Sequence, residues 1–321
     1  MIVITGAAGF IGSVILKHFN DKGHENILAV DKLGEKTKWK NLTNKKFIDF
    51  CDKDDFISNL TEFNKIDSII HMGACTDTAE FNLDYLMKNN FEYSKILFEY
   101  SVKNKIPFIY ASSAATYGGG EKGYDDKMED ISSLTPLNPY GFSKQLFDQW
   151  LLMQPETPPF WAGFKFFNVY GPNEYHKDRM ASVIYHTFNQ INESGKMKLF
   201  KSHRPDYKHG EQKRDFVYVK DVAEIIYYFY ENRPENGIFN LGTGNARTFN
   251  DLAENVIKNS NIKAEIEYIN MPKDIRDKYQ YFTEARMNKL RKAGYDKEFH
   301  SLEEGIRDYV TNFLAHNYKI L

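Results

Sequence analysis

The segment Ile2-Val-Ile-Thr-Gly6-Ala-Ala-Gly9-Phe-Ile-Gly12 decides the fold that we expect for this chain of 321 residues. Its first four residues form an apolar, β-branched run, which is typical of a buried parallel strand. The glycines follow at once, and Ile15, Leu16 and Phe19 then recur at helical spacing. A strand, a glycine loop and a helix in this order predict a turn that binds a dinucleotide.

Each of the three glycines is expected to have its own task in this turn. Gly6 permits the tight bend, Gly9 lets a pyrophosphate approach the backbone, and Gly12 lets the helix pack on the strand. The N–H groups at the start of that helix then face the phosphates. A plain strand–helix turn is the alternative, and the complete context favours the dinucleotide site.

The second expected strand covers residues 26–30. The residues that follow it do not decide between NAD and NADP. An acidic residue about 20 positions after the glycines commonly binds the ribose hydroxyls of NAD, and Asp31 stands there. Lys32, Lys36 and Lys38 follow it, and their charges suit the 2′-phosphate of NADP. The local residues therefore support NAD and NADP alike.

The rest of the chain alternates between expected strands and helices. Strand patterns lie at residues 47–49, 66–71, 107–110 and 160–167. The alternation predicts an α/β protein with a Rossmann-like, doubly wound parallel sheet. We expect residues 1–170 and about 215–241 to form the dinucleotide-binding domain, and about 171–214 and 242–321 to form a smaller C-terminal α/β lobe for the substrate.

Tyr140 and Lys144 are expected to share one face of a helix, one turn apart. A nearby ammonium favours the phenolate and lowers the pKa of a tyrosine from its usual value near ~10. The pair is then able to move a proton to or from a substrate hydroxyl. Ser112 and Ser113 follow the strand 107–110 at the ligand edge of the sheet, where they suit either a substrate oxygen or the capping of a turn.

Composition excludes several classes of partner. The formal net charge of −2 and the isoelectric point near 6.5 argue against a nucleic-acid partner. No apolar run approaches the roughly 18 to 20 residues that span a bilayer, and the chain enters a strand pattern without a signal peptide. Cys51 and Cys75 indicate neither a disulfide framework nor a metal site. We therefore expect a cytoplasmic protein without membrane, nucleic-acid or metal partners.

Motifs along the whole chain carry a resemblance to a known family. They are the glycine loop, Ser112-Ser113, the Tyr140/Lys144 pair, Phe167-Asn-Val-Tyr-Gly-Pro172, Arg214-Asp-Phe-Val-Tyr-Val219 and Asn240-Leu-Gly-Thr-Gly244. In this combination they resemble the extended short-chain dehydrogenase/reductase family of NAD(P)-dependent sugar epimerases and dehydratases. The resemblance implies the Rossmann-like fold and a nucleotide-sugar substrate.

Four longer phrases narrow the resemblance. They are His71-Met-Gly-Ala-Cys-Thr76, Tyr110-Ala-Ser-Ser-Ala-Ala-Thr-Tyr-Gly-Gly119, Glu174-Tyr-His-Lys-Asp-Arg-Met-Ala-Ser182 and Lys278-Tyr-Gln-Tyr-Phe-Thr283. They are similar to the family members that invert C6″ of an ADP-linked heptose for the lipopolysaccharide core. This implies ADP-heptose as substrate, NADP as cofactor (one per subunit, with NAD possible) and a homo-oligomer, for which the family precedent is a pentamer.

The resemblance also implies a mechanism and the residues that carry it. The alcohol at C6″ is oxidised to a transient ketone, and hydride returns to the opposite face. Because the ketone turns between the two transfers, its oxygen needs two proton partners, which are Tyr140 and Lys177 by position, assisted by Lys144 and Ser113.

Further positions are carried over as contacts. The implied cofactor contacts are Gly6, Gly9, Phe10, Ile11, Gly12, Asp31, Lys32, Lys38, Lys53, Met72, Gly73, Ala74, Cys75, Thr76, Asn89, Lys144 and Val169. The implied substrate contacts are Ser113, Asn168, Arg179, His186, Phe200, Arg214 and Tyr279. Arg179 departs from the family pattern, in which a small serine more usually stands at that position.

Two other functions remain open from the residues. A UDP-hexose 4-epimerase uses the same oxidation and rotation of a ketone. A 4,6-dehydratase needs a further acid/base pair after the active-site serine, and Ala114-Ala115-Thr116 supplies none. A non-catalytic NADP-sensing protein with this fold is disfavoured, because such a protein has no need of both Tyr140 and Lys144.

Overall fold

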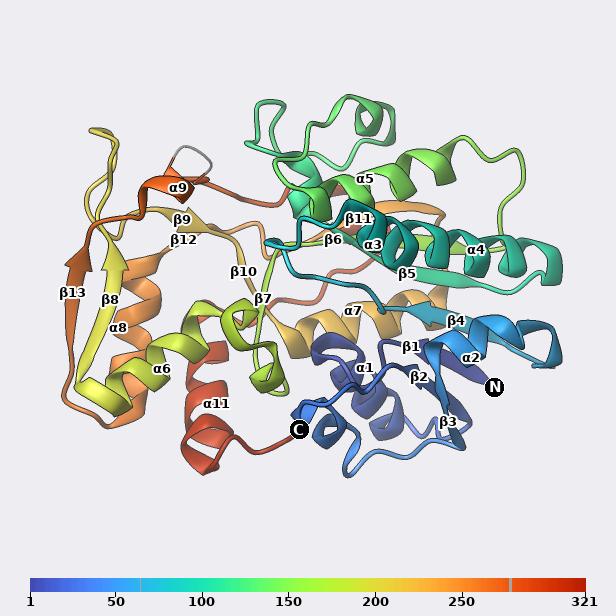
Figure 1. Cartoon of the computed structure of the whole chain (residues 1–321), viewed down its shortest axis with the longest axis horizontal. Helices are drawn as coiled ribbons and strands as arrows, with labels where there is room; N and C mark the ends of the chain where they lie inside the picture. The colour runs from blue at the N-terminus through green and yellow to red at the C-terminus, as the bar shows by residue number, and fades with distance from the viewer. Residues whose placement is uncertain (64, 277–278) are drawn as a thin grey trace.

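The computed structural model describes residues 1–63, 65–276 and 279–321. Lys278, which begins one of the family phrases, lies outside the described residues. A parallel sheet of seven strands forms the centre, in the order β11-β6-β5-β4-β1-β2-β3 (Figure 1). Its strands are β1 (Ile2–Thr5), β2 (Ile27–Asp31), β3 (Asp49–Asp52), β4 (Ser68–His71), β5 (Phe108–Ser113), β6 (Trp161–Phe166) and β11 (Gly237–Leu241).

This sheet confirms the predicted doubly wound α/β fold. The strand order reverses between β1 and β4, and ligands of such sheets bind beyond the carboxyl ends of the strands at this point. One difference from the prediction is in β5, which continues to Ser113. The small, polar residues after Tyr110 were predicted to be a loop, but pairing with β6 as far as Ser113↔Phe166 extends the strand.

Helices cover both faces of the sheet, because successive side chains of a strand point to opposite faces. Ile2 and Ile4 of β1 enter one buried cluster, whereas Val3 enters the other. Figure 1 shows α1 (Phe10–Asp21) and α7 (Val219–Asn232) on one side, and α4 (Tyr93–Asn104) and α5 (Pro139–Leu152) on the other. The short helix α2 (Lys53–Ser58) contributes Phe56 to the same cluster as α4 and α5.

Residues 83–104, between β4 and β5, do not form one continuous α-helix. They comprise α3 (Leu83–Leu86), a π-helical segment η3 (Met87–Glu92) and α4. A π-helical turn changes which side chains face inward and is frequent at functional sites. Here it buries Asn90, whose side-chain amide pairs with both backbone groups of Cys75 at 2.8 and 2.9 Å. The interruption therefore holds the loop that follows β4.

A smaller lobe lies at the left of Figure 1. It contains the parallel pair β8 (Lys196–Phe200) and β13 (Glu265–Ile269), with helices α6 (Val183–Ser194), α8 (Phe249–Ser260) and α11 (Leu302–Asn312). Two strand pairs lie between it and the sheet: β7 (Asn168–Tyr170) with β10 (Phe216–Tyr218), and β9 (Lys213–Arg214) with β12 (Arg247–Thr248).

The remaining helices are short. They are α9 (Lys273–Arg276), α10 (Asn288–Lys292) and the segments η1 (Thr37–Leu42), η2 (Leu60–Glu62), η4 (Ala114–Tyr117), η5 (Met128–Ser133), η6 (Tyr175–Met180) and η7 (Leu314–His316). Among the described residues, none of the helices combines the length and the apolar character that crossing a membrane requires.

Phe164 of β6 tests the packing between the sheet and α7. Its ring is fully buried, 4.9 Å from the ring of Phe229 and 5.9 Å from that of Phe239. We expect Phe164→Ala to lower the free energy of unfolding by about 3–5 kcal/mol, because it leaves a cavity in a rigid core. Urea denaturation measures this loss, with the exposed Phe142→Ala as the control. A loss below about 1 kcal/mol would contradict this account of the core.

Candidate functional site

Two adjoining cavities lie at the carboxyl edge of the sheet. The first has a volume of about 440 Å³ and follows the glycine loop, the end of β2 and the loop after β4. The second measures about 300 Å³ and lies between the end of β5, α5, β7 and η6. Both are lined by Phe10, Ile11, Met72, Ala74 and Thr76, and Lys177 also faces both. The two cavities therefore share a wall.

The predicted cofactor contacts gather on the first cavity. All of them line it except Lys144 and Val169, which line the second. Asp77, Tyr85, Tyr93 and His176 also line the first cavity and were missed from the sequence. Tyr93 stands one helical turn after Asn89, and that spacing is the signal that could have found it.

The glycine loop is built by close contacts between backbone segments. Gly6 has a φ of +68°, and a Cβ atom there would lie 2.7 Å from the backbone nitrogen of Gly73. A Cβ atom on Gly12 would clash with the carbonyl oxygen of Gly6. Gly9 is the N-cap residue of α1 and has no side chain to pair with the first N–H groups of the helix. These uncapped N–H groups suit the phosphates of a dinucleotide.

The carboxylate of Asp31, the acidic residue predicted to follow the glycine loop, contacts the backbone of that loop. One carboxylate oxygen accepts a hydrogen bond from the N–H of Ala8 at 2.8 Å, and the other accepts from the N–H of Lys32 at 2.7 Å. The ammonium of Lys38 forms an ion pair with the same carboxylate. Asp31 and Lys38 therefore form one charged unit at the end of the first cavity.

The helix α5 presents Tyr140 and Lys144 to the second cavity. Pro139 opens the helix, and Asn138 caps it by accepting the N–H of Gly141 at 2.7 Å. Lys144 is buried and donates to the carbonyl oxygen of Ala111 at 2.9 Å. Burial lowers the pKa of Lys144 to about 8, although the charge of Asp148 opposes the decrease.

The pKa of the Tyr140 phenol is raised, whereas the sequence analysis expected it to be lowered. Burial raises the pKa above its ordinary value, and a hydrogen bond with Ser113 opposes that rise. The sequence predicted a decrease because it showed the nearby lysine and not the desolvation of the hydroxyl. At neutral pH the phenol is therefore protonated and suited to donating a proton.

The two serines after β5 have different surroundings. Ser113 accepts the N–H of Ala115 at 3.1 Å, so it caps the turn η4, and it also lies beside Tyr140. Ser112 instead donates to the buried carboxylate of Asp148 at 2.7 Å. The structure therefore shows the capping role for Ser113 and places Ser112 in an internal network.

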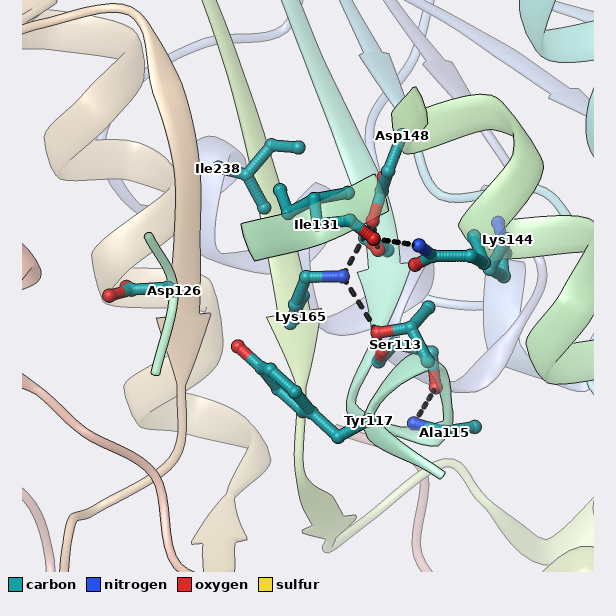
Figure 2. A network of polar contacts seen from close by, with 12 residues as sticks. Ser113, Ala115, Tyr117, Asp126, Ile131, Lys144, Asp148, Lys165 and Ile238 are labelled. Atoms are coloured by element: carbon teal, nitrogen blue, oxygen red, sulfur yellow. Dashed lines mark hydrogen bonds and ion pairs between the residues drawn. The ribbon is translucent and has the colours of Figure 1, made fainter. Parts of the chain in front are cut away.

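A buried ion pair lies behind this wall of the cavity (Figure 2). Asp148 and Lys165 are both fully buried, and their charged groups are 2.7 Å apart. Lys165 also donates to the hydroxyl of Thr116, and this hydroxyl donates to the carbonyl oxygen of Ser113. The sequence analysis missed this pair, although Asp148 follows Tyr140 and Lys144 at the same spacing of four residues. The pair connects α5, β6 and the turn that carries Ser113.

Lys177 lines the same cavity as Tyr140 but belongs to another element. It lies on η6, and its ammonium donates to the hydroxyl of Thr76 at 3.2 Å. Burial lowers the pKa of Lys177, while the charge of Glu174 opposes the decrease. The second cavity thus has Tyr140, Lys144 and Ser113 on one side and Lys177 on another, with Asn168 and Val169 of β7 also in its lining.

The other predicted substrate contacts are more scattered. Arg214 of β9 lies 5.3 Å from the ring of Tyr279 and 5.7 Å from that of Phe249, which lines the second cavity. Phe200 packs against Tyr279 at 6.2 Å between ring centroids. Arg179 is exposed and paired with Asp77 at 2.7 Å. Neither Arg179 nor His186 is among the described residues that line the two cavities.

His71 is buried, and both of its ring nitrogens have hydrogen-bond partners. Its two ring nitrogens lie 2.6 Å from the hydroxyl of Thr5 and 2.9 Å from that of Ser94. Burial lowers its pKa to about 3, so the ring is neutral. Thr5 also accepts the N–H of Gly73 at 3.2 Å, and the histidine therefore helps to hold the wall of the first cavity.

Comparison with known proteins places this architecture in a class. The model of the NAD dependent epimerase/dehydratase family matches residues 2–242, and the chain belongs to this family. The family description, together with the lining of the first cavity, supports a nicotinamide dinucleotide as the cofactor.

Individual relatives within this family share one particular name. The ADP-L-glycero-D-manno-heptose-6-epimerase of Fusobacterium nucleatum subsp. nucleatum is 50% identical, with 98% of each chain covered. The protein of the same name from Nitratidesulfovibrio vulgaris strain DP4 is 47% identical, again over 98% of each chain. The crystal structure of the Helicobacter pylori ADP-L-glycero-D-manno-heptose-6-epimerase superimposes with a TM-score of 0.81 at 28% identity, covering 97% of this chain and 95% of that one.

Gly12 tests the contact between α1 and the glycine loop. We expect Gly12→Ala to reduce the affinity for the nicotinamide dinucleotide by at least about tenfold, because the added methyl group displaces the loop from the start of the helix. Fluorescence titration with the reduced dinucleotide measures the affinity. Gly23→Ala is the control, since a Cβ atom there meets nothing within 4 Å and Gly23 is not among the described residues that line the two cavities, although its φ of +91° adds local strain. Unchanged affinity in Gly12→Ala would contradict the assignment of the loop.

Proposed function

We propose that this chain interconverts ADP-D-glycero-β-D-manno-heptose and ADP-L-glycero-β-D-manno-heptose, which are precursors of the lipopolysaccharide core. The observation that carries the proposal is a cavity with Tyr140 and Lys177 on different elements, next to the dinucleotide cavity. The two curated relatives named as 6-epimerases support the substrate, since each is aligned over nearly the whole chain. The chain is an isomerase on this basis.

The chemistry is a reversible oxidation at C6″ of the heptose. A nicotinamide dinucleotide supplies hydride acceptance and donation when it is bound. Tyr140 and Ser113 bind the C6″ oxygen in one orientation, and Lys177 binds it in the other. Each residue moves the proton of that oxygen as the alcohol becomes a ketone and is then restored. Because the two residues lie on different elements, the ketone is able to meet a new proton partner after it turns.

The charge states of these residues suit such a cycle. Burial keeps the Tyr140 phenol protonated, so it is ready to donate when the ketone is reduced. Burial also lowers the pKa of Lys177, which makes release of its proton less costly than for an exposed lysine. Lys144 lines the same cavity as Tyr140, and its hydrogen bond to the carbonyl oxygen of Ala111 fixes the direction of its side chain.

We assign the remaining predicted contacts by their place. Arg214, stacked beside Tyr279 and Phe249, suits the diphosphate, because a guanidinium binds phosphate oxygens in pairs. Asn168 and Phe200 are proposed substrate contacts, and His186 and Arg179 remain predictions. We further propose that about 171–214 and 242–321 act as the substrate lobe, that the chain assembles as a homo-oligomer with the pentamer of the family precedent, and that it acts in the cytoplasm.

The activity and its two acid/base residues are tested together. Incubation with ADP-D-glycero-β-D-manno-heptose is expected to yield the L-glycero epimer, which chromatography and NMR distinguish. Tyr140→Phe and Lys177→Met are each expected to lower kcat by about 100-fold or more, the usual scale for a positioned acid/base group.

Tyr318→Phe and Lys198→Met, on exposed residues, are the matched controls and are expected to retain kcat. Near-normal turnover in Tyr140→Phe or Lys177→Met would refute the role of that residue. Conversion of UDP-glucose, with no conversion of the heptose, would assign the chain to the 4-epimerases instead. No conversion of either sugar would favour a non-catalytic NADP-sensing protein.

We propose NADP as the preferred dinucleotide. The carboxylate of Asp31 already accepts two backbone N–H groups and pairs with Lys38, which leaves it less available for ribose hydroxyls. Lys32 and Lys53 line the same cavity and add positive charge for a 2′-phosphate.

Lys38→Ala is therefore expected to weaken NADP binding by about tenfold and NAD binding by much less, because a charged contact with the 2′-phosphate is lost. Isothermal titration calorimetry measures both affinities. Lys40→Ala is the control, since Lys40 lies two residues away and is exposed. Equal loss for both dinucleotides would argue against a contact with the 2′-phosphate.

A further inference from the structure

The loop that carries Lys177 is closed by one buried carboxylate. Glu174 is 1% exposed and stands between the end of β7 and the start of α6. The hydroxyl of Ser182 donates to its Oε1 at 2.7 Å, and the N–H of Ser182 donates to its Oε2 at 2.5 Å. The N–H of Gly171 also donates to Oε1, at 3.3 Å. The side chain therefore ties together the two ends of the loop, 171–182.

Lys177 is connected to Glu174 by a hydrogen bond between their backbone groups. Its N–H donates to the carbonyl oxygen of Glu174 at 2.9 Å. The next residue, Asp178, has φ 47° and ψ −126°, a combination that residues with a Cβ atom rarely adopt. Such a conformation persists where the surrounding contacts enforce it. The Glu174 carboxylate supplies contacts of this kind on both sides of the turn.

Through Ser182, the contacts of the Glu174 carboxylate also extend to the start of the helix α6. Ser182 is the N-cap of this helix, and its hydroxyl accepts the N–H of Tyr185 at 3.2 Å while it donates to Glu174. The carboxylate accepts from three donors, which favours its ionised form, although burial raises its pKa. These hydrogen bonds fix the carboxyl group at the start of the loop that carries Lys177.

We propose that Glu174 is a positioning residue for Lys177, holding the loop in the shape that aims the ammonium into the cavity shared with Tyr140. This inference rests on the proposed function, because it takes Lys177 as the second acid/base residue. Glu174 acts through Lys177 and the loop, so its removal is expected to change turnover more than substrate binding.

The charge of Glu174 has a second effect on Lys177. Burial lowers the pKa of Lys177, and Lys38 of η1 lowers it further, whereas Glu174, Asp77 and Cys75 raise it. His176, beside Lys177 in the chain, has its own pKa lowered to about 4 and is neutral at physiological pH. Loss of the Glu174 charge is therefore expected to lower the pKa of Lys177 and to move the corresponding limb of the pH profile to lower pH.

Glu174→Gln tests the proposal with little change of shape. We expect kcat to fall by about tenfold or more and KM and the affinity for NADP to stay within about twofold. Glu193→Gln, the same change at an exposed position of α6, is the matched control. In the Lys177→Met background, Glu174→Gln is expected to lower kcat by less than about twofold, because two residues that act as a unit are not additive.

A measurement that needs no substrate tests the role of Glu174 independently of the proposed function. The pH dependence of Lys177 labelling by trinitrobenzenesulfonate, followed by peptide mass spectrometry, reports the pKa of Lys177. A wild-type chain that fails to convert the heptose refutes the proposed function, while the labelling still tests whether Glu174 acts on Lys177.

Two results would overturn the positioning role. One is an unchanged labelling profile in Glu174→Gln. The other is an equal loss of kcat in the wild-type and Lys177→Met backgrounds. If Glu174→Gln does not fold, Ser182→Ala, which removes one hydroxyl contact of the carboxylate, is expected to shift the Lys177 profile in the same direction by a smaller amount. No shift in that variant would also overturn the role.

Discussion

The contact between two backbone turns, at Gly6 and Gly73, is the constraint on which the site depends. These turns follow β1 and β4, the neighbouring strands between which the sheet reverses its order. A Cβ atom on Gly6 would lie 2.7 Å from the nitrogen of Gly73, so the turns approach closely because neither residue has a side chain. Thr5 and His71 hold the same junction by hydrogen bonds. The dinucleotide cavity opens directly beyond it.

Buried polar groups lie next to the side chains around the second cavity that we propose as acid/base groups. Behind Tyr140 and Lys144, the Asp148–Lys165 pair joins α5, β6 and the turn of Ser113 (Figure 2). Burial of a charged pair contributes little net stability, and its value here lies in the fixed geometry of the groups it contacts. Glu174 has the corresponding place behind Lys177. Each wall of the cavity thus has its own internal carboxylate.

Several parts of this arrangement were predictable because they depend on local chemistry. The glycine loop, the cap and proline that open α5, and the order of strands and helices follow from residues close in sequence. The resemblance carried Lys177 to its position, where the structure finds it facing both cavities. Arg179 and His186 are not among the described residues that line the two cavities, and Arg179 instead pairs with Asp77 of the first cavity.

The sequence by itself determined the fold class, the dinucleotide turn and the pairing of Tyr140 with Lys144 on one helix face. Tertiary structure decided the pKa of Tyr140, which burial raises, and the length of β5, which pairing with β6 extends. It also decided that Asp148 and Glu174 are buried, on the segments that carry the proposed acid/base residues Tyr140 and Lys177. Local periodicity is encoded by neighbouring residues, whereas desolvation and contacts between distant segments arise when the chain packs.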